Sequence, residues 1–340
     1  MTDILSMLPE ELSADLKAKG LPAFRAKQIS QWLSKGASSF DEMLNLPKDL
    51  RSSLAEEYSI YRPTVLKKQA SALDGTIKYL WQLSDGNAVE TVVMKYSYGN
   101  SVCISTQVGC RQGCAFCAST IGGKVRDLTP SEMLNEVFCS QLDSGMDISN
   151  IVLMGIGEPL DNFDNVVRFL RLVNHPNVMN IGMRHITLST CGIIERFPDL
   201  AALDLQLNLA VSLHAPDDET RSKIMPANHG RGVEALMQAC REYNKRTGRR
   251  ITFEYAMING VNDSPAQARL LAKRAKGVGA HVNLIGLNHV EESKLEPSTK
   301  ENMTAFIKIL EDEGVNVTLR RKLGSDVDAS CGQLRRKFMK

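Results

Sequence analysis

The sequence of 340 residues lacks the features that would mark a membrane or a secreted protein. No apolar run approaches the about 20 residues needed to span a bilayer, so we do not expect a membrane protein. The start, MTDILSMLPEELSADL, carries acidic residues and no basic-then-apolar signal pattern. The cytoplasm is therefore the expected location, and 43% hydrophobic residues suffice for a large core.

The eight cysteines do not form the pattern of a disulfide-stabilised protein. In a long chain without a secretion signal, cysteines indicate metal binding or catalysis rather than disulfides. Cys139 and Cys240 lie within helical patterns beside apolar residues, so we expect them to be buried as small hydrophobic side chains. The remaining six are Cys103, Cys110, Cys114, Cys117, Cys191 and Cys331.

A strong net charge is missing as well, since the formal net charge is only +2. This balance hides basic clusters, which are YRPTVLKKQ, NKRTGRR, KRAKG, TLRRKLG and LRRKFMK. The last two flank Cys331, which favours a phosphate-rich substrate near that cysteine.

The first hundred residues show two kinds of local pattern. Residues 1–60 are expected to form a short helical unit, in which FRAKQISQWLSKG places Phe24, Ile29, Trp32 and Leu33 at roughly helical spacing and ends at Gly36 as a C-terminal cap. This unit either binds nucleic acid or caps the main domain, and the sequence leaves both open. Residues 61–98 form a strand-rich connecting segment, in which TIKYLWQL and AVETVVMKY flank the turn SDGN.

From about residue 99 to 325, strands alternate with helices. The predicted strands are 101–106, 150–154, 185–190, 207–213, 251–257, 281–286 and 315–320. A capping box at Thr129 opens one helix, while Ser264 opens another that Gly277 closes. Six β–α units in series predict a parallel sheet covered by helices, either doubly wound or curled into a barrel. In both folds the functional groups gather at the carboxyl ends of the strands.

The segment CRQGCAFC, residues 110–117, places three cysteines after the first of these strands. A structural zinc site needs four ligands, so zinc would require a distant fourth residue. Inert buried thiols are disfavoured because the loop carries two glycines and one large apolar residue. A [4Fe–4S] cluster fits better, since three thiolates leave one iron open for a small molecule.

This spacing of Cys110, Cys114 and Cys117, with an aromatic residue before the last, resembles the signature of radical S-adenosylmethionine (SAM) enzymes. The resemblance implies a partial (βα)6 TIM-like barrel. It also implies one [4Fe–4S] cluster on the three thiolates, with SAM on the fourth iron.

Further motifs resemble the RlmN family, whose members methylate C2 of an adenosine in 23S ribosomal RNA and in many cases also modify transfer RNA. They are GNSVCISTQVGCRQGCAFCAST, MGIGEPLDNFDNV, RHITLSTCGII, AVSLHAPDDETRSKIMP, EYAMINGVND and DVDASCGQL. The resemblance implies an accessory RNA-binding domain at 1–60, a connecting segment at 61–98, a barrel core at 99–325 and a C-terminal segment at 326–340.

The resemblance also assigns the site. The residues implied for SAM are Gly157, Glu158, Ser189, Ser212, Leu213, His214 and Asn283. A glycine allows close backbone approach, and a carboxylate can hold the SAM ammonium group. Cys331 would carry the methyl group as S-methylcysteine, Glu90 would accept the C2 proton, and Cys103 would release the product by forming a transient disulfide with Cys331. Two SAM molecules are used per turnover, and Cys191 receives no role.

The implied partners are 23S rRNA, tRNA and an electron donor such as flavodoxin with its reductase, and the expected state is a monomer. Two alternatives stay open. The related Cfr type methylates C8 of the same adenosine and shares the cluster and both working cysteines. A non-catalytic iron–sulfur or zinc RNA-binding protein would not need Cys103, Cys331 or the SAM residues.

Overall fold

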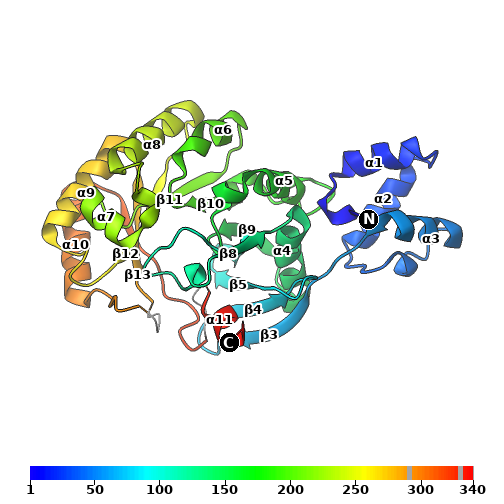
Figure 1. Cartoon of the computed structure of the whole chain (residues 1–340), viewed down its shortest axis with the longest axis horizontal. Coiled ribbons are helices and arrows are strands. Elements are labelled where there is room, and N and C mark those ends of the chain that lie inside the picture. The colour runs from blue at the N-terminus through cyan, green and yellow to red at the C-terminus, as the bar shows by residue number, and fades with distance from the viewer. Residues whose placement is uncertain (289–292, 328–331, 340) are drawn as a thin grey trace.

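A single ten-stranded sheet organises the chain (Figure 1). The structure is a computed structural model that describes residues 1–288, 293–327 and 332–339. The strands follow the order β14-β13-β12-β11-β10-β9-β6-β5-β4-β3. The parallel strands are β6 (Gly99–Cys103), β9 (Ile148–Leu153), β10 (Ile186–Thr190), β11 (Asn208–Ser212), β12 (Thr252–Met257), β13 (His281–Gly286) and β14 (Val317–Leu319).

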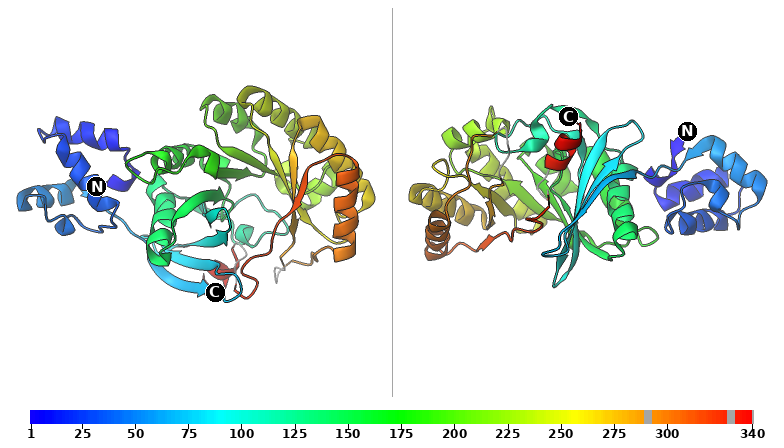
Figure 2. Two further views of the ribbon diagram at one scale, coloured as in Figure 1. Left: turned by 180° about the vertical axis from the view of Figure 1, so that it is seen from behind. Right: turned by 90° about the horizontal axis from the view of Figure 1, so that it is seen from below.

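Helices cover the outer face of the parallel strands, as Figures 1 and 2 show. They are α4 (Pro130–Ser144), α5 (Phe163–Asn174), α6 (Phe197–Ala202), α7 (Asp218–Ile224), α8 (Val233–Thr247), α9 (Pro265–Val278) and α10 (Lys300–Asp312). The parallel strands lie in sequence order without the reversal that a doubly wound sheet requires. The predicted partial barrel is therefore confirmed, and the doubly wound alternative is excluded.

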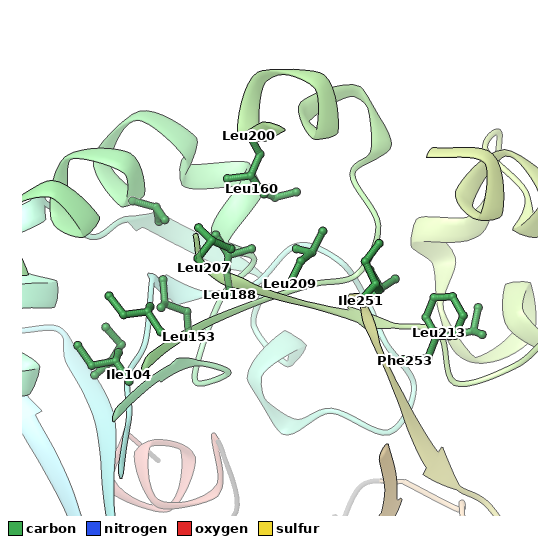
Figure 3. Close-up of a cluster of buried hydrophobic side chains, with 14 of the residues drawn as sticks. Ile104, Leu153, Leu160, Leu188, Leu200, Leu207, Leu209, Leu213, Ile251 and Phe253 are labelled. Carbon is green, nitrogen blue, oxygen red and sulfur yellow. The ribbon is translucent and has the colours of Figure 1, made fainter. Parts of the chain in front are cut away.

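The core lies between the sheet and these helices (Figure 3). Leu153, Leu188 and Leu209 project from neighbouring strands, and Leu160 and Leu200 meet them from the helical layer. All five are almost fully buried. Every second residue of each strand thus faces the helices, which leaves the alternate residues for the concave side of the sheet.

Three antiparallel strands continue the sheet from β6, and we call them the extension: β5 (Ala88–Tyr96), β4 (Ile77–Gln82) and β3 (Thr64–Ala70). The strand β3 was not predicted, because its lysines and exposure match an edge strand better than a buried one. The C-terminal helix α11 (Gln333–Met339) lies against the extension (Figure 2).

The N-terminal unit has its own hydrophobic cluster and contains α1 (Pro9–Ala18), α2 (Phe24–Leu33) and α3 (Lys48–Glu57). Two short strands, β1 (Thr2–Asp3) and β2 (Tyr58–Ser59), pair within it. It contacts the barrel directly, since Arg168 on α5 donates to the carbonyl of Ser6 at 2.6 Å. Arg62, just after the unit, also bridges the two parts, because its guanidinium donates to the carbonyl of Leu33 and to Asn135 on α4, both at 2.7 Å.

Some predicted details were wrong. Gly277 lies inside α9, and Gly279 in the left-handed conformation ends that helix. The helix α2 ends at Leu33 with Ser34 as its C-cap, and not at Gly36. The first barrel strand was predicted to reach Thr106 but ends at Cys103. The N–H of Thr106 donates instead to the carbonyl of Ile156 in the loop that follows β9. None of the helices in the described ranges is long and apolar enough to cross a membrane.

Candidate active site

The three-cysteine loop follows β6 and is held in shape by a small hairpin. The hairpin pairs β7 (Gln107–Gly109) with β8 (Lys124–Asp127). Gly109 has a φ of 77°, and a Cβ there would lie 2.0 Å from the carbonyl oxygen of Gly123. Only glycine fits this close crossing, so the residue before Cys110 is dictated by the backbone. Ala115 donates its N–H to the carbonyl of Ile224 at 2.9 Å and ties the loop to the barrel.

All three cysteines line one cavity of about 280 Å³ at the carboxyl ends of the strands. Five of the residues predicted to bind SAM line the same cavity, namely Gly157, Glu158, Ser189, Ser212 and His214. They come from β9, β10 and β11 or from the residues that follow these strands. Side chains far apart in the sequence meet because parallel strands end on the same side of a barrel.

The thiols suit a cluster better than a single metal ion. Burial raises the pKa of Cys110 to about 12 and that of Cys114 further, and the neighbouring thiols add to both shifts. Such thiols stay protonated unless a metal displaces the proton. In the part of the chain that the structure describes, no three thiol, imidazole or carboxylate groups gather closely enough to hold one ion. A [4Fe–4S] cluster takes each thiolate on a different iron, so its ligands are spread more widely than those of zinc.

Glu158 joins two strand ends at the cavity wall. One carboxylate oxygen accepts the N–H of Leu160 at 3.0 Å, and the other accepts the N–H of Cys191 at 2.7 Å. Burial raises the pKa of this carboxyl, while the two N–H donors act in the opposite direction. Each oxygen keeps a second lone pair, so the carboxylate can still accept hydrogen bonds from a cationic ligand.

Gly157 precedes this carboxylate in a conformation with φ 113°. A Cβ here would lie 2.7 Å from Thr106 Oγ1 and from Gln107. The glycine therefore lets the strand end pass directly over the loop that leads to the cysteines.

His214 is a neutral imidazole facing the cavity. The Nδ1 atom accepts the N–H of Ala256 at 2.9 Å, which leaves the proton on Nε2. Burial lowers the pKa of His214 to about 3, and Arg221 adds to this shift. The ring packs edge-on against Phe116 of the cysteine loop at 4.8 Å. Its φ of 56° is unusual for a residue other than glycine, so packing on several sides determines its position.

The other predicted SAM residues lie outside this cavity wall. The side chain of Leu213 packs in the main core, as Figure 3 shows, and only its backbone is near the site. Asn283 lies lower on the concave face and donates to Glu254 at 2.9 Å. Glu254 itself lines the cavity and was missed by the sequence prediction. A single carboxylate within the apolar strand ITFEYAM was the available signal, since buried strands rarely carry one.

Two of the three residues predicted to act on the methyl group, Cys103 and Glu90, lie on the neighbouring strands β6 and β5. Cys103 is 5% exposed on the last position of β6, and it packs against Val92 and Met94 of β5. Glu90, on β5, is 3% exposed and does not line the cavity of the cysteines. It forms a buried ion pair with Lys78 at 2.8 Å. Cys331 lies outside the described residues.

A second cavity, of about 640 Å³, occupies the concave face toward the amino ends of the strands. Four arginines line it, which are Arg249, Arg250, Arg320 and Arg321. Two stacked tyrosines, Tyr96 and Tyr98, also line it, with ring centroids 5.0 Å apart. The basic clusters NKRTGRR and TLRRKLG thus meet in space, which their separation in the sequence did not show. Met154, Glu254 and Arg320 line both cavities, so the two chambers adjoin.

Comparison with known proteins defines the class first. Residues 104–271 match the family model of the Radical SAM superfamily. The crystal structure of a radical SAM methyltransferase from Sphaerobacter thermophilus superposes with a TM-score of 0.93 at 39% identity, over 98% of this chain and 99% of that one. The barrel with its three-cysteine cavity is therefore that of a radical SAM enzyme.

The relatives then define the family. Residues 2–60 match the model described as the ribosomal RNA large subunit methyltransferase N-terminal domain. A protein of Lachnoclostridium phytofermentans is 50% identical over 99% of this chain and 95% of its own length. Another, of Lachnospira eligens, is 50% identical over 100% and 97%. Both are named "Probable dual-specificity RNA methyltransferase RlmN". The chain belongs to the RlmN family.

Proposed function

We propose that this chain methylates C2 of an adenosine in 23S rRNA, and C2 of an adenosine beside the anticodon of some tRNAs. The proposal rests on the family and on one observation: a cavity lined by three cysteines adjoins a second cavity lined by arginines and tyrosines. Arginines neutralise phosphates, and tyrosines provide faces on which unpaired bases stack. A base in the arginine-lined cavity would lie near Met154, which also lines the cavity of the three cysteines.

The residues suit the groups that the reaction needs. Cys110, Cys114 and Cys117 would hold a [4Fe–4S] cluster, and SAM would lie against the wall formed by Gly157, Glu158, Ser189, Ser212 and His214, with Leu213 contributing its backbone and Asn283 supporting Glu254. When bound, the cluster and SAM would supply the reactive groups: one SAM molecule provides the methyl group, and a second provides the radical in each turnover. The neutral His214 offers an N–H donor from Nε2, and the Glu158 carboxylate offers an acceptor for an ammonium group.

The protein's own residues would carry the methyl group and accept the proton from C2. Cys331, as a thiolate, would take the methyl group; after the radical removes one hydrogen atom from that methyl group, the resulting methylene carbon would link the sulfur of Cys331 to C2 of the base. Glu90 accepts the proton that leaves C2. The thiolate of Cys103 would attack the sulfur of Cys331, so that an S–S bond forms as the bond from that sulfur to the carbon on the base breaks. This carbon takes up a proton and becomes the methyl group of the released base, and two electrons and two protons from a reductant then reopen the disulfide.

The test of this assignment is a pair of cysteine variants. Cys103→Ala should accumulate protein covalently attached to RNA, because the bond to Cys331 forms and is not released. Cys331→Ala should give neither adduct nor product, because the methyl carrier is missing. Free methylated RNA from Cys103→Ala would refute the releasing role of Cys103.

Mass spectrometry of ribosomal and transfer RNA, from cells with and without the gene, tests the position of methylation. Loss of 2-methyladenosine supports the proposal, whereas loss of 8-methyladenosine would identify the Cfr type. If the reconstituted protein binds iron and sulfide but never forms 5′-deoxyadenosine from SAM, the chain is an RNA-binding protein without this activity.

The proposal includes a monomeric state, a cytoplasmic location and an electron donor of the flavodoxin type. Sedimentation of the purified protein tests the first. Reduction of the protein by flavodoxin with its reductase, compared with a chemical reductant, tests the last.

A further inference from the structure

The extension β3–β4–β5 has two faces with different contents. Tyr79, Trp81 and Val89 belong to the main core and face α4. The opposite face carries Lys78 and Glu90, which are buried although they belong to an outlying part of the sheet. Burying a lysine and a glutamate is costly unless both are paired, so something must cover this face and satisfy them.

The C-terminal helix α11 is what covers this face. Leu334, 1% exposed, packs against Leu80 and Ala88. The Glu90 carboxylate accepts the N–H of Gly332 at 2.7 Å and the N–H of Arg335 at 2.6 Å. The same carboxylate is paired with Lys78 at 2.8 Å, so one buried group joins β4, β5 and the start of α11.

A second attachment lies before the helix, at the turn that joins β3 to β4. Asp326 accepts the hydroxyl of Ser71 at 2.6 Å and the N–H of Ala72 at 2.9 Å. From the turn itself, Asp74 accepts the N–H of Gly324 at 2.8 Å. The C-terminal segment is therefore tied to the extension on both sides of residues 328–331.

The attachment at Gly332, where α11 begins, also contacts the cysteine loop. Gly332 has a φ of 79°, and a Cβ there would lie 2.7 Å from the backbone nitrogen of Ser119. Ser119 follows Cys117 by two residues, so the residue bonded to Cys331 rests directly on the end of the proposed cluster-binding loop.

We propose that the extension is the platform that positions the methyl carrier, with Lys78, Asp74 and Asp326 as positioning residues. This inference rests on the proposed role of Cys331. Lys78 acts through Glu90, which holds Gly332, and the two aspartates hold the chain before the carrier. The strand-rich segment at 61–98 is thus more than a connection between two domains.

The first test uses the protein without its cluster and measures hydrogen exchange of the C-terminal peptide by mass spectrometry. Lys78→Met removes the ammonium group and keeps much of the side-chain volume. We expect exchange of this peptide to be about tenfold faster, because the Glu90 carboxylate that accepts the N–H groups of Gly332 and Arg335 would lose its buried ion-pair partner; tenfold corresponds to about 1.4 kcal/mol. Asp326→Asn should act in the same direction without a buried charge being left unpaired. Asp312→Asn, at an exposed position at the end of α10, is the matched control and should change nothing.

The second test uses the reconstituted enzyme and measures methylated RNA per 5′-deoxyadenosine formed. The decisive variant here is Asp326→Asn, because it leaves the pair of Lys78 with the proposed proton acceptor Glu90 intact. A displaced carrier should lower this ratio severalfold while SAM consumption continues, whereas general destabilisation would lower both together. Unchanged exchange in Lys78→Met and Asp326→Asn, or an unchanged ratio, would overturn the platform. A wild-type protein that never methylates RNA would instead refute the proposed function, and the exchange experiment would still report on the attachment.

Discussion

Arg221, which lies behind the wall of the active-site cavity, should be costly to remove. It is 2% exposed on α7, and its guanidinium donates to the carbonyls of Cys191 at 2.7 Å, Leu213 at 3.0 Å and Ser212 at 3.2 Å. A fourth bond reaches Asn228 at 2.8 Å. One side chain thus holds the ends of β10 and β11 together behind the cavity.

Arg221→Met would leave these buried acceptors without a donor. Each hydrogen bond to a charged group contributes about 1.5–3 kcal/mol, and part of this is offset because the guanidinium no longer has to be desolvated. By analogy with breaking a buried ion pair, the net loss should be about 3–5 kcal/mol in the free energy of unfolding. This is a large fraction of the about 5–15 kcal/mol that stabilises a typical domain.

Urea unfolding of the cluster-free protein measures this loss directly. Arg241→Met is the matched control, because Arg241 forms a surface ion pair with Glu234 that should contribute little to stability. Arg221→Lys should remain clearly destabilised, since an ammonium group cannot reproduce the planar set of donors. A loss below about 1 kcal/mol for Arg221→Met would show that the loops are held by other contacts.

Three further predictions concern the same region. Gly157→Ala should destabilise the protein and weaken SAM binding measured by calorimetry, because its Cβ would overlap Thr106 and Gln107 and its φ is 113°; SAM affinity at the wild-type level would contradict this. The pKa of His214 is lowered to about 3, below its ordinary 6.5, so the unfolded state binds its proton first. The free energy of unfolding should therefore fall as the pH drops below about 6.5, and by less in His214→Gln, and equal slopes would count against a buried neutral ring. Burial alone would raise the pKa of Asp74, but hydrogen bonds from the N–H groups of Gly324 and Thr76 lower it to about 2. Its stabilising contribution, measured as wild type minus Asp74→Asn in urea, should be present above about pH 4 and disappear toward pH 2, and a difference that is independent of pH would refute it.

Local patterns in the sequence were sufficient for most of the secondary structure. The capping box at Thr129 and the Ser264-Pro265 start depend on neighbours within a few residues, and both helices begin where predicted. The cysteine spacing is equally local, because a single loop supplies all three cysteines. Helix ends were predicted less well from local patterns. The helix predicted to close at Gly277 continues to Val278, and Gly279 provides the left-handed cap.

The sequence by itself determined the barrel, the cysteine loop and the family, since each depends on short motifs in a regular order. Only the tertiary structure decided that Glu254 enters the active site, that two arginine clusters share one cavity, and that the C-terminal segment rests on Glu90 and Lys78. These pairings join residues separated by many strands and helices. They follow from which strand edges and faces become neighbours once the sheet has formed, and no local propensity encodes that.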